Sequence, residues 1–174
     1  EETKTLVIHN LDINSSPNYL QRAVNSSCDI SGASFLPIDP TCNKCQMDIK
    51  KTFKLNDLKE DGSITAIRIE GSKKSINQRI EILNKELNTF NLSTSTLETL
   101  QSEIFWKKIR NLEFLSKSTN NIFRVVIPPA SCTQFIYQLP KTFKFFLDWG
   151  GALIWVEACE LTEPMFNSVR KKAI

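Results

Sequence analysis

The sequence contains little histidine, little glycine and no long hydrophobic run, and each shortage excludes a class of function. His9 is the single histidine of 174 residues, so every Ser/His/Asp or Cys/His catalytic arrangement would have to use it. Its place within an apolar segment favours a structural histidine over a general base. The five glycines form no Gly-rich loop of the kind that cradles phosphate groups. No segment approaches the roughly 20 apolar residues that cross a bilayer, so no transmembrane segment is predicted.

Charge and cysteine content further limit the partners and metal sites that this protein is expected to have. The net charge of +3 is small and the basic residues form short, scattered clusters, so nucleic acid is not an expected partner. The five cysteines are odd in number and irregularly spaced, which favours reduced thiols in a cytoplasmic protein. Cys42 and Cys45 have the spacing of a metal or redox motif, but two further zinc ligands are missing. Incidental thiols are therefore favoured, and no metal site is predicted.

The first elements of the chain are a strand, a helix and an extended segment. Residues 4–11 predict the strand. Ser16-Pro17 predicts the helix start, because serine caps helix N-termini and proline fits the first helical turn. A short extended piece follows at 31–37, bounded by turn-forming residues. Residues 38–62 lack sustained periodicity, and we expect them to form a loop insert.

Regular structure then resumes in a strand and the clearest amphipathic helix of the chain. Residues 63–70 alternate as a strand with at least one buried face. Ser72 can cap the helix that follows, where apolar residues recur at spacings of four, three and four, namely Ile76, Ile80, Leu83 and Leu87. Residues 88–99 are polar, with serine and threonine alternating, and predict a linker.

The second half contains a helix, a strand, a short helix and a hairpin. The helix is expected over residues 100–115, and a strand over 122–127 that ends at two prolines. A short helix is expected over 131–139. The order β-α-β-α, linker, α-β-α-β-β predicts a single α+β domain over residues 1–174. We interpret it as a ferredoxin-like antiparallel sheet with helices packed on one face.

The hairpin over residues 143–158 organises the rest of the chain. Two runs rich in aromatic and β-branched side chains flank Gly150-Gly151, and such runs suit a largely buried sheet. A two-residue Gly-Gly turn tolerates positive φ at both positions, as a tight hairpin requires. Trp149 lies at its shoulder and Trp155 on the return strand. Core packing is the favoured role for both tryptophans, and the alternative is that the turn lets a ligand approach closely.

Five stretches in order along nearly the whole chain carry a family resemblance. They are Ser31-Gly-Ala-Ser-Phe-Leu-Pro37, Ile67-Arg-Ile-Glu-Gly71, Phe105-Trp-Lys-Lys-Ile-Arg110, Phe123-Arg-Val-Val-Ile-Pro-Pro129, and Asp148-Trp-Gly-Gly-Ala152 followed by Trp155. Together they resemble the C-terminal half of the E subunit of bacterial glycolate oxidase, an FAD-linked oxidase of the vanillyl-alcohol-oxidase type. The Gly-Gly-His-like segment with which that family usually continues has no counterpart in residues 162–174.

The resemblance implies a cap domain, which covers the flavin and shapes the substrate side of such an oxidoreductase. FAD is then held by a separate FAD-binding domain, so no cofactor is expected to bind this chain. The expected partners are that domain and other glycolate oxidase subunits, through which a cytoplasmic chain would lie peripheral to the inner membrane. No complete catalytic site is expected, and the chain is expected to be inactive alone.

Four residues are the candidates for facing a flavin or substrate: Arg124, Asp148, Trp149 and Gly150. A guanidinium offers planar bidentate donors, so Arg124 can pair with a carboxylate substrate. The alternative for Arg124 is a structural ion pair with Asp148 across neighbouring strands. A different class of function also stays open, namely a stand-alone ferredoxin-like binding or regulatory module for a small molecule or a protein partner.

Overall fold

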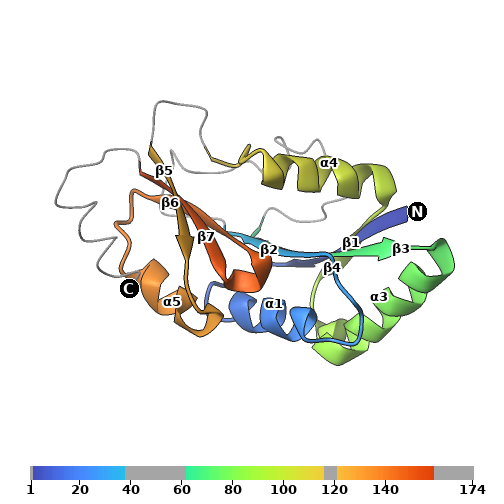
Figure 1. Ribbon diagram of the computed structural model, residues 1–174. Coiled ribbons are helices and arrows are strands. Elements are labelled where there is room, and N and C mark those ends of the chain that lie inside the picture. Colours follow the sequence, from blue (N-terminus) through green and yellow to red (C-terminus); the bar gives the residue numbers. More distant parts are fainter. Residues whose placement is uncertain (1, 38–61, 116–120, 159–174) are drawn as a thin grey trace.

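A computed structural model describes residues 2–37, 62–115 and 121–158. These residues form one seven-stranded sheet with four α-helices (Figure 1). Every strand pair in this sheet is antiparallel, which confirms the predicted α+β class. The loop insert predicted at 38–62 lies almost wholly outside the described residues.

The first half of the chain is a ferredoxin-like unit with the connectivity β-α-β-β-α-β. Its strands lie in the order β4-β1-β3-β2. The elements are β1 (Glu2–His9), α1 (Ser16–Val24), β2 (Gly32–Leu36), β3 (Ile64–Gly71), α3 (Lys73–Leu87) and β4 (Thr94–Leu97). The extended piece expected at 31–37 is therefore an interior strand of the sheet.

The second half extends this sheet beyond β2. Its elements are α4 (Thr99–Arg110), β5 (Asn121–Val126), α5 (Cys132–Tyr137), β6 (Lys144–Asp148) and β7 (Leu153–Ala158). Strand β6 joins β2 where Phe35 pairs with Leu147, and the buried Ser34 hydroxyl donates to the Leu147 carbonyl at 2.6 Å. Among the described residues the strand order is β4-β1-β3-β2-β6-β7-β5, so β5 lies at the edge of this sheet.

Helix α3 forms as its sequence predicts. The Ser72 hydroxyl accepts from the Ser75 backbone N–H at 3.4 Å and so caps the helix N-terminus. Ile76, Leu83 and Leu87 are fully buried on the inner face of the helix, and Ile80 is partly buried. The spacing of four, three and four residues therefore marks the face that packs on the sheet.

The linker predicted at 88–99 is wrong in part, because Thr94–Leu97 forms strand β4. This strand pairs with β1 along the sheet edge, where Thr5 lies opposite Leu97. Among its four residues only Leu97 is buried, so the hydrophobic pattern of the segment is weak. Threonine side chains suit a strand, and backbone pairing with β1 determines the structure here.

The helices cover both faces of the sheet, whereas the sequence interpretation placed them on one. Helices α1, α3 and α5 share a face, and α4 lies across the other, as Figure 1 shows. Phe105 and Ile109 of α4 pack against Val7, Ala66 and Phe146 of the strands. Helix α4 is also shorter than expected and ends at Arg110. The space beside α4 on this face holds the candidate site.

Candidate functional site

A cavity of about 870 Å³ lies on the α4 face of the sheet. Its lining comes from α4, from strands β2, β3, β5 and β7, and from the loop that joins β6 to β7. All four predicted site residues, Arg124, Asp148, Trp149 and Gly150, line it. The structure therefore brings together residues that the sequence separates by up to 26 positions, counting from Arg124 to Gly150.

All five stretches that carry the family resemblance reach this cavity. Each contributes lining residues, namely Ser31, Gly32 and Ala33 from the first, Arg68 and Glu70 from the second, Trp106, Lys107, Ile109 and Arg110 from the third, Arg124 from the fourth, and Asp148, Trp149, Gly150 and Trp155 from the fifth. Five separate parts of the chain thus converge on one concave surface.

The three tryptophans of the chain also meet at the cavity, with different degrees of exposure. Trp106 is only 8% exposed, and Trp155 is partly buried against the core beneath α4. Trp149 is 60% exposed. Core packing, the role favoured from sequence, therefore describes Trp155 in part and is wrong for Trp149.

The Arg124 guanidinium lies over the Trp149 indole, 4.9 Å from the ring centroid. This cation–π contact holds a flat donor group against a flat apolar one. The ion pair between Arg124 and Asp148, kept open from sequence, is not formed. Strand β7 separates β5 from β6, so the register partner of Arg124 is Trp155. Within the described residues, Arg124 makes no hydrogen bond or ion pair.

Asp148 ends strand β6 and is held by the loop that it begins. Its Oδ1 accepts from the Trp149 backbone N–H at 2.8 Å. Burial raises the pKa of the Asp148 carboxyl above its usual range, and this hydrogen bond and the charge of Arg68 oppose the shift only in part. A neutral Asp148 is therefore favoured to higher pH than in an exposed aspartate.

Asp148→Asn is expected to raise the melting temperature at pH 7 to 8 and to leave it near the parent value at about pH 3. The asparagine keeps an oxygen that can accept from Trp149 and carries no charge. Because the folded-state pKa of Asp148 is raised, its protonated form stabilises the fold below the unfolded-state pKa. That contribution is lost as pH rises through the folded-state pKa. Thermal melting across this pH range checks the prediction, and a variant less stable than the parent at pH 8 would contradict it.

The loop between β6 and β7 holds an unusual run of left-handed backbone. Trp149, Gly150 and Gly151 have φ values of 50°, 65° and 91°, so the predicted positive φ at both glycines is confirmed. The last strand pair is Asp148 with Leu153, which makes the connection four residues long instead of the two expected. A non-glycine residue with positive φ is uncommon, and its strain is tolerated where the surroundings fix it.

Helix α1 holds the β6–β7 loop in this conformation. The Gln21 side-chain amide donates to the Gly150 carbonyl at 2.6 Å. A Cβ added at Gly150 would lie 2.7 Å from the Val24 Cγ2 atom, so the loop backbone is pressed against the helix. The loop therefore presents the exposed indole of Trp149 in a fixed place.

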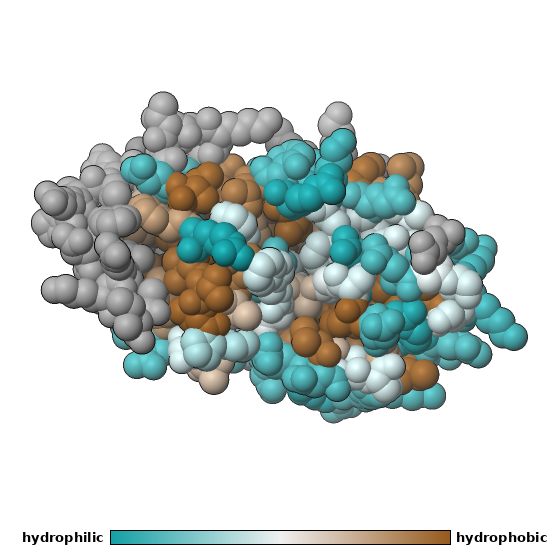
Figure 2. All heavy atoms as spheres, viewed as in Figure 1, coloured by the Kyte–Doolittle hydropathy of each residue, from teal (hydrophilic) through white to brown (hydrophobic). Residues whose placement is uncertain are grey.

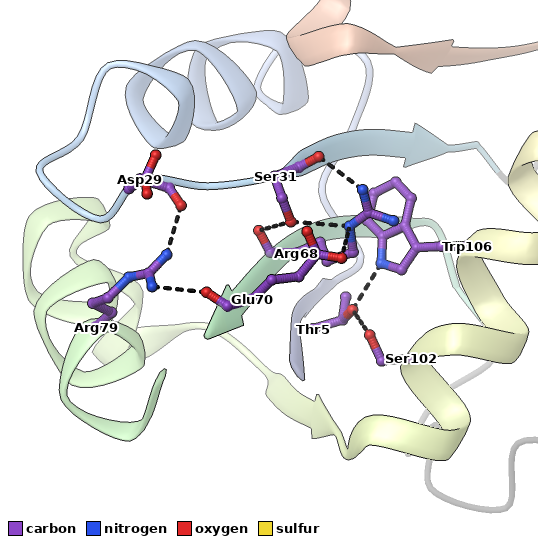
Figure 3. Close-up of polar contacts among 8 residues, drawn as sticks. All are labelled: Thr5, Asp29, Ser31, Arg68, Glu70, Arg79, Ser102 and Trp106. Carbon is purple, nitrogen blue, oxygen red and sulfur yellow. Dashed lines mark hydrogen bonds and ion pairs between the residues drawn. The ribbon is translucent and has the colours of Figure 1, made fainter. Parts of the chain in front are cut away.

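Another part of the cavity lining is a polar cluster around Trp106 and Arg68, drawn in Figure 3. The Trp106 indole donates to the Thr5 hydroxyl at 2.8 Å, and this hydroxyl lies 2.6 Å from that of Ser102. The Arg68 guanidinium lies over the Trp106 ring at 5.0 Å and donates to the hydroxyl and carbonyl of Ser31, both at 3.0 Å. Trp106 is thus held by Arg68 over its ring and by Thr5 at its indole N–H.

Sequence reasoning did not identify Arg68 and Trp106 as site residues. They belong to different elements, β3 and α4, and no short-range spacing links them. The one local signal is Gly32, where an added Cβ would lie 3.1 Å from two atoms of the Trp106 ring. A glycine within a strand marks a place where another group comes close.

Three cations that line the cavity have no acidic partner among the described residues. Lys107 and Arg110, from the last turn of α4, are exposed, as is Arg124. Within the part of the chain that the structure describes, none of the three makes an ion pair or hydrogen bond. Arg68 differs, because it has partners within the chain. Its Nε lies 3.6 Å from the Glu70 carboxylate and donates a hydrogen bond to the Ser31 hydroxyl. The unpaired cations favour a ligand or surface of negative charge.

The remaining candidates from sequence lie elsewhere. His9 is 2% exposed, its Nε2 lies 2.8 Å from the Ser95 hydroxyl, and it is absent from the cavity lining, which fits a structural role. Cys42 and Cys45 fall outside the described residues. In the residues that are described, no group of three or more histidine, cysteine or acidic side chains could hold a metal ion. No helix in this part of the chain is long and apolar enough to cross a membrane.

Comparison with known proteins gives a likeness of fold. No protein-family description matches the sequence, and no curated protein sequence is similar to it. Among solved structures, alkyldihydroxyacetonephosphate synthase resembles the chain with a TM-score of 0.50 and 11% sequence identity, over 99% of this chain and 38% of that one. A VAO-type flavoprotein from Myceliophthora thermophila gives a TM-score of 0.42 and 10% identity, over 99% of this chain and 36% of that one. The chain therefore has the fold of one portion of that synthase and spans well under half of its length.

Proposed function

We propose that this chain is the cap, or substrate-side, domain of an FAD-linked oxidase of the vanillyl-alcohol-oxidase type, in a glycolate-oxidase-like subunit. The observation that carries the proposal is the convergence of all five family-like stretches on one cavity. Motifs that served the fold alone would be spread through the core. The likeness to a portion of a larger synthase supports the same interpretation, because such a portion works beside other domains.

In this role the residues of the chain bind and orient the substrate. Arg124 lies on Trp149 and makes no hydrogen bond or ion pair with the other described residues, so its guanidinium is suited to a substrate carboxylate. Burial raises the pKa of Asp148 and so disfavours its charge, which lessens its repulsion of that carboxylate. An FAD in the partner domain would supply the electron acceptor, and the exposed Trp149 indole would face that domain.

The chain itself does not fit the pyrophosphate of FAD. In the described residues only Gly71 comes directly before a capped helix, and Ser72 occupies the position where a phosphate would bind α3. A phosphate site of this kind needs several open backbone N–H groups, which one glycine does not provide. The FAD-binding domain must therefore come from a partner or from another part of a longer chain.

The surface offers a place for such a domain. Figure 2 shows hydrophobic side chains gathered over the β5–β7 part of the sheet. On the edge strand β5, Ile122 and Val126 are 39% and 54% exposed, and Arg124 lies between them in sequence. An exposed apolar patch beside an unpaired cation is typical of a surface that another domain covers.

The purified chain is expected to be colourless after incubation with excess FAD, because it lacks the phosphate-binding loop. Co-expressed with the flavin-binding polypeptide of its own organism, it is expected to elute as a yellow complex of equal stoichiometry. Size-exclusion chromatography with detection at the flavin absorbance checks both results. Stoichiometric FAD uptake by the chain alone, or failure of the two polypeptides to associate, would contradict the proposal.

A stand-alone ferredoxin-like binding or regulatory module is the second candidate. The observation in its favour is that five separate parts of this chain line a cavity of about 870 Å³, a size that suits a small ligand. Ligand binding by the isolated chain, together with no association with any flavin-binding polypeptide, would favour this second function.

A further inference from the structure

We propose that the ligand of the cavity is an aryl carboxylate, a carboxylic acid with a flat aromatic body, and not the two-carbon acid glycolate. The inference rests on the proposed function in taking this ligand to be the substrate. The binding itself concerns this chain alone and is measured on it.

The size of the cavity is the first reason. Its volume of about 870 Å³ falls within the range of roughly 300–1,000 Å³ that drug-sized ligands occupy. A two-carbon acid bound at Arg124 would leave most of this space to water. A larger body attached to the same carboxylate would exclude that water and bury apolar surface.

The second reason is what the rest of the lining offers. All three tryptophans of the chain face the cavity, from α4, from the β6–β7 loop and from β7. Trp149 is held by the loop and by Arg124, and Trp155 is only partly buried, so these two indoles offer surface to the cavity, whereas Trp106 is 8% exposed. Fixed indoles offer flat surfaces against which an aromatic ring packs in offset or edge-to-face geometry. Glycolate has no group that could use them.

The third reason is the charge of the site. Arg124, Lys107 and Arg110 make no internal ion pair among the described residues, so a carboxylate finds donors that are already free. Asp148, the acid nearest to Trp149 in the chain, accepts from the Trp149 N–H, and burial disfavours its charge. Arg68 is already engaged by Ser31 and Glu70, so it does not compete with Arg124 for the carboxylate. An anionic end at Arg124 and a ring packed against Trp149 and Trp155 would match this lining.

Mandelate, an aryl 2-hydroxy acid, is the probe. Lactate replaces its ring by a methyl group, and 1-phenyl-1,2-ethanediol replaces its carboxylate by a neutral alcohol. Isothermal titration with the isolated chain is expected to give mandelate an affinity at least about ten-fold above either analogue, a difference of about 1.4 kcal/mol. Tryptophan fluorescence should change in parallel, because every tryptophan lines the cavity. Lactate, glycolate or the sugar acid gluconate binding as tightly as mandelate, or no saturable mandelate binding, would overturn the inference.

Variants identify the groups that bind. Arg124→Gln is expected to weaken the affinity for mandelate at least about ten-fold and to leave the affinity for the neutral diol unchanged. Arg124→Lys should bind mandelate with an affinity between those of the parent and Arg124→Gln. Trp149→Leu should weaken the affinity for mandelate toward that for lactate, because the indole that contacts the aromatic ring is lost. Arg22→Gln is the matched control, because its guanidinium stacks over Tyr19 at 5.7 Å outside the cavity lining, and it should bind as the parent does. Equal losses in Arg22→Gln and Arg124→Gln would contradict the assignment, with circular dichroism confirming that each variant is folded.

The two proposals fail separately. If the chain associates with the flavin-binding polypeptide but shows no preference for mandelate, the aryl-carboxylate proposal is wrong and the cap-domain proposal is retained. If the chain prefers mandelate but does not associate with the flavin-binding polypeptide, the cap-domain proposal is wrong. The aryl carboxylate would then be the ligand of a binding module.

Discussion

Gly150→Val is expected to lower the melting temperature by roughly 5–15 °C, corresponding to a loss of about 2–4 kcal/mol in the free energy of unfolding. Two effects add. A β-branched residue at φ 65° carries a conformational strain of about 1–2 kcal/mol, and its Cβ would lie 2.7 Å from the Val24 Cγ2 atom. Thermal melting followed by circular dichroism measures the loss.

Two matched variants separate the strain from the clash. Gly151 has a φ of 91°, but an added Cβ there would lie 4.0 Å from the Cys132 sulfur, so Gly151→Val should suffer the strain alone and melt higher than Gly150→Val. Asparagine tolerates the left-handed region, so Gly150→Asn combined with Val24→Ala should melt near the parent. If Gly150→Val and Gly151→Val melt at the same temperature, contact with α1 is not what fixes the loop.

Trp106→Ala is expected to reduce the free energy of unfolding by about 3–5 kcal/mol. Its side chain is 8% exposed, packs edge-to-face on Phe105 with centroids 5.4 Å apart, and donates to the Thr5 hydroxyl. Alanine would remove this packing and leave the hydroxyl pair of Thr5 and Ser102 beside a void. Urea denaturation, with the slope of the transition held in common, gives the difference.

Trp149→Ala is the matched control for Trp106→Ala. Trp149 is 60% exposed, so its loss should cost less than about 1 kcal/mol, although both tryptophans lie against an arginine in the same cavity. If the two alanine variants lose equal stability, Trp106 is not the buried anchor of α4 that the structure describes. Trp106→Phe keeps an aromatic ring but removes the indole N–H, so it should lose less unfolding free energy than Trp106→Ala.

Much of the fold follows from local patterns in the sequence. Helix α3 is predictable because its buried residues recur at helical spacing and Ser72 caps it. The β6–β7 hairpin is predictable because two β-rich runs flank a pair of glycines. Strand β4 is not predictable in this way, since it buries only Leu97 and exists through its pairing with β1.

The site shows the same division between local and long-range information. Arg124, Asp148, Trp149 and Gly150 were reached through the resemblance, and they share a cavity. The sequence does not show which strands are neighbours, so it permits an ion pair between Arg124 and Asp148 that the sheet order excludes by placing β7 between their strands. The packing of Arg68 on Trp106 joins β3 to α4 across 38 positions, and only the sheet order and the placement of α4 bring them together.

Flavin fluorescence in the complex with the flavin-binding polypeptide tests most directly whether this cavity faces a flavin. An indole in contact with an excited flavin ring quenches its emission by electron transfer. We predict weak emission for the parent complex and for Tyr137→Leu, whose exposed ring lies outside the cavity lining, and strong emission for Trp149→Leu. Equal emission from all three intact complexes would contradict the claim that the Arg124–Trp149 cavity is the substrate side of a cap over FAD.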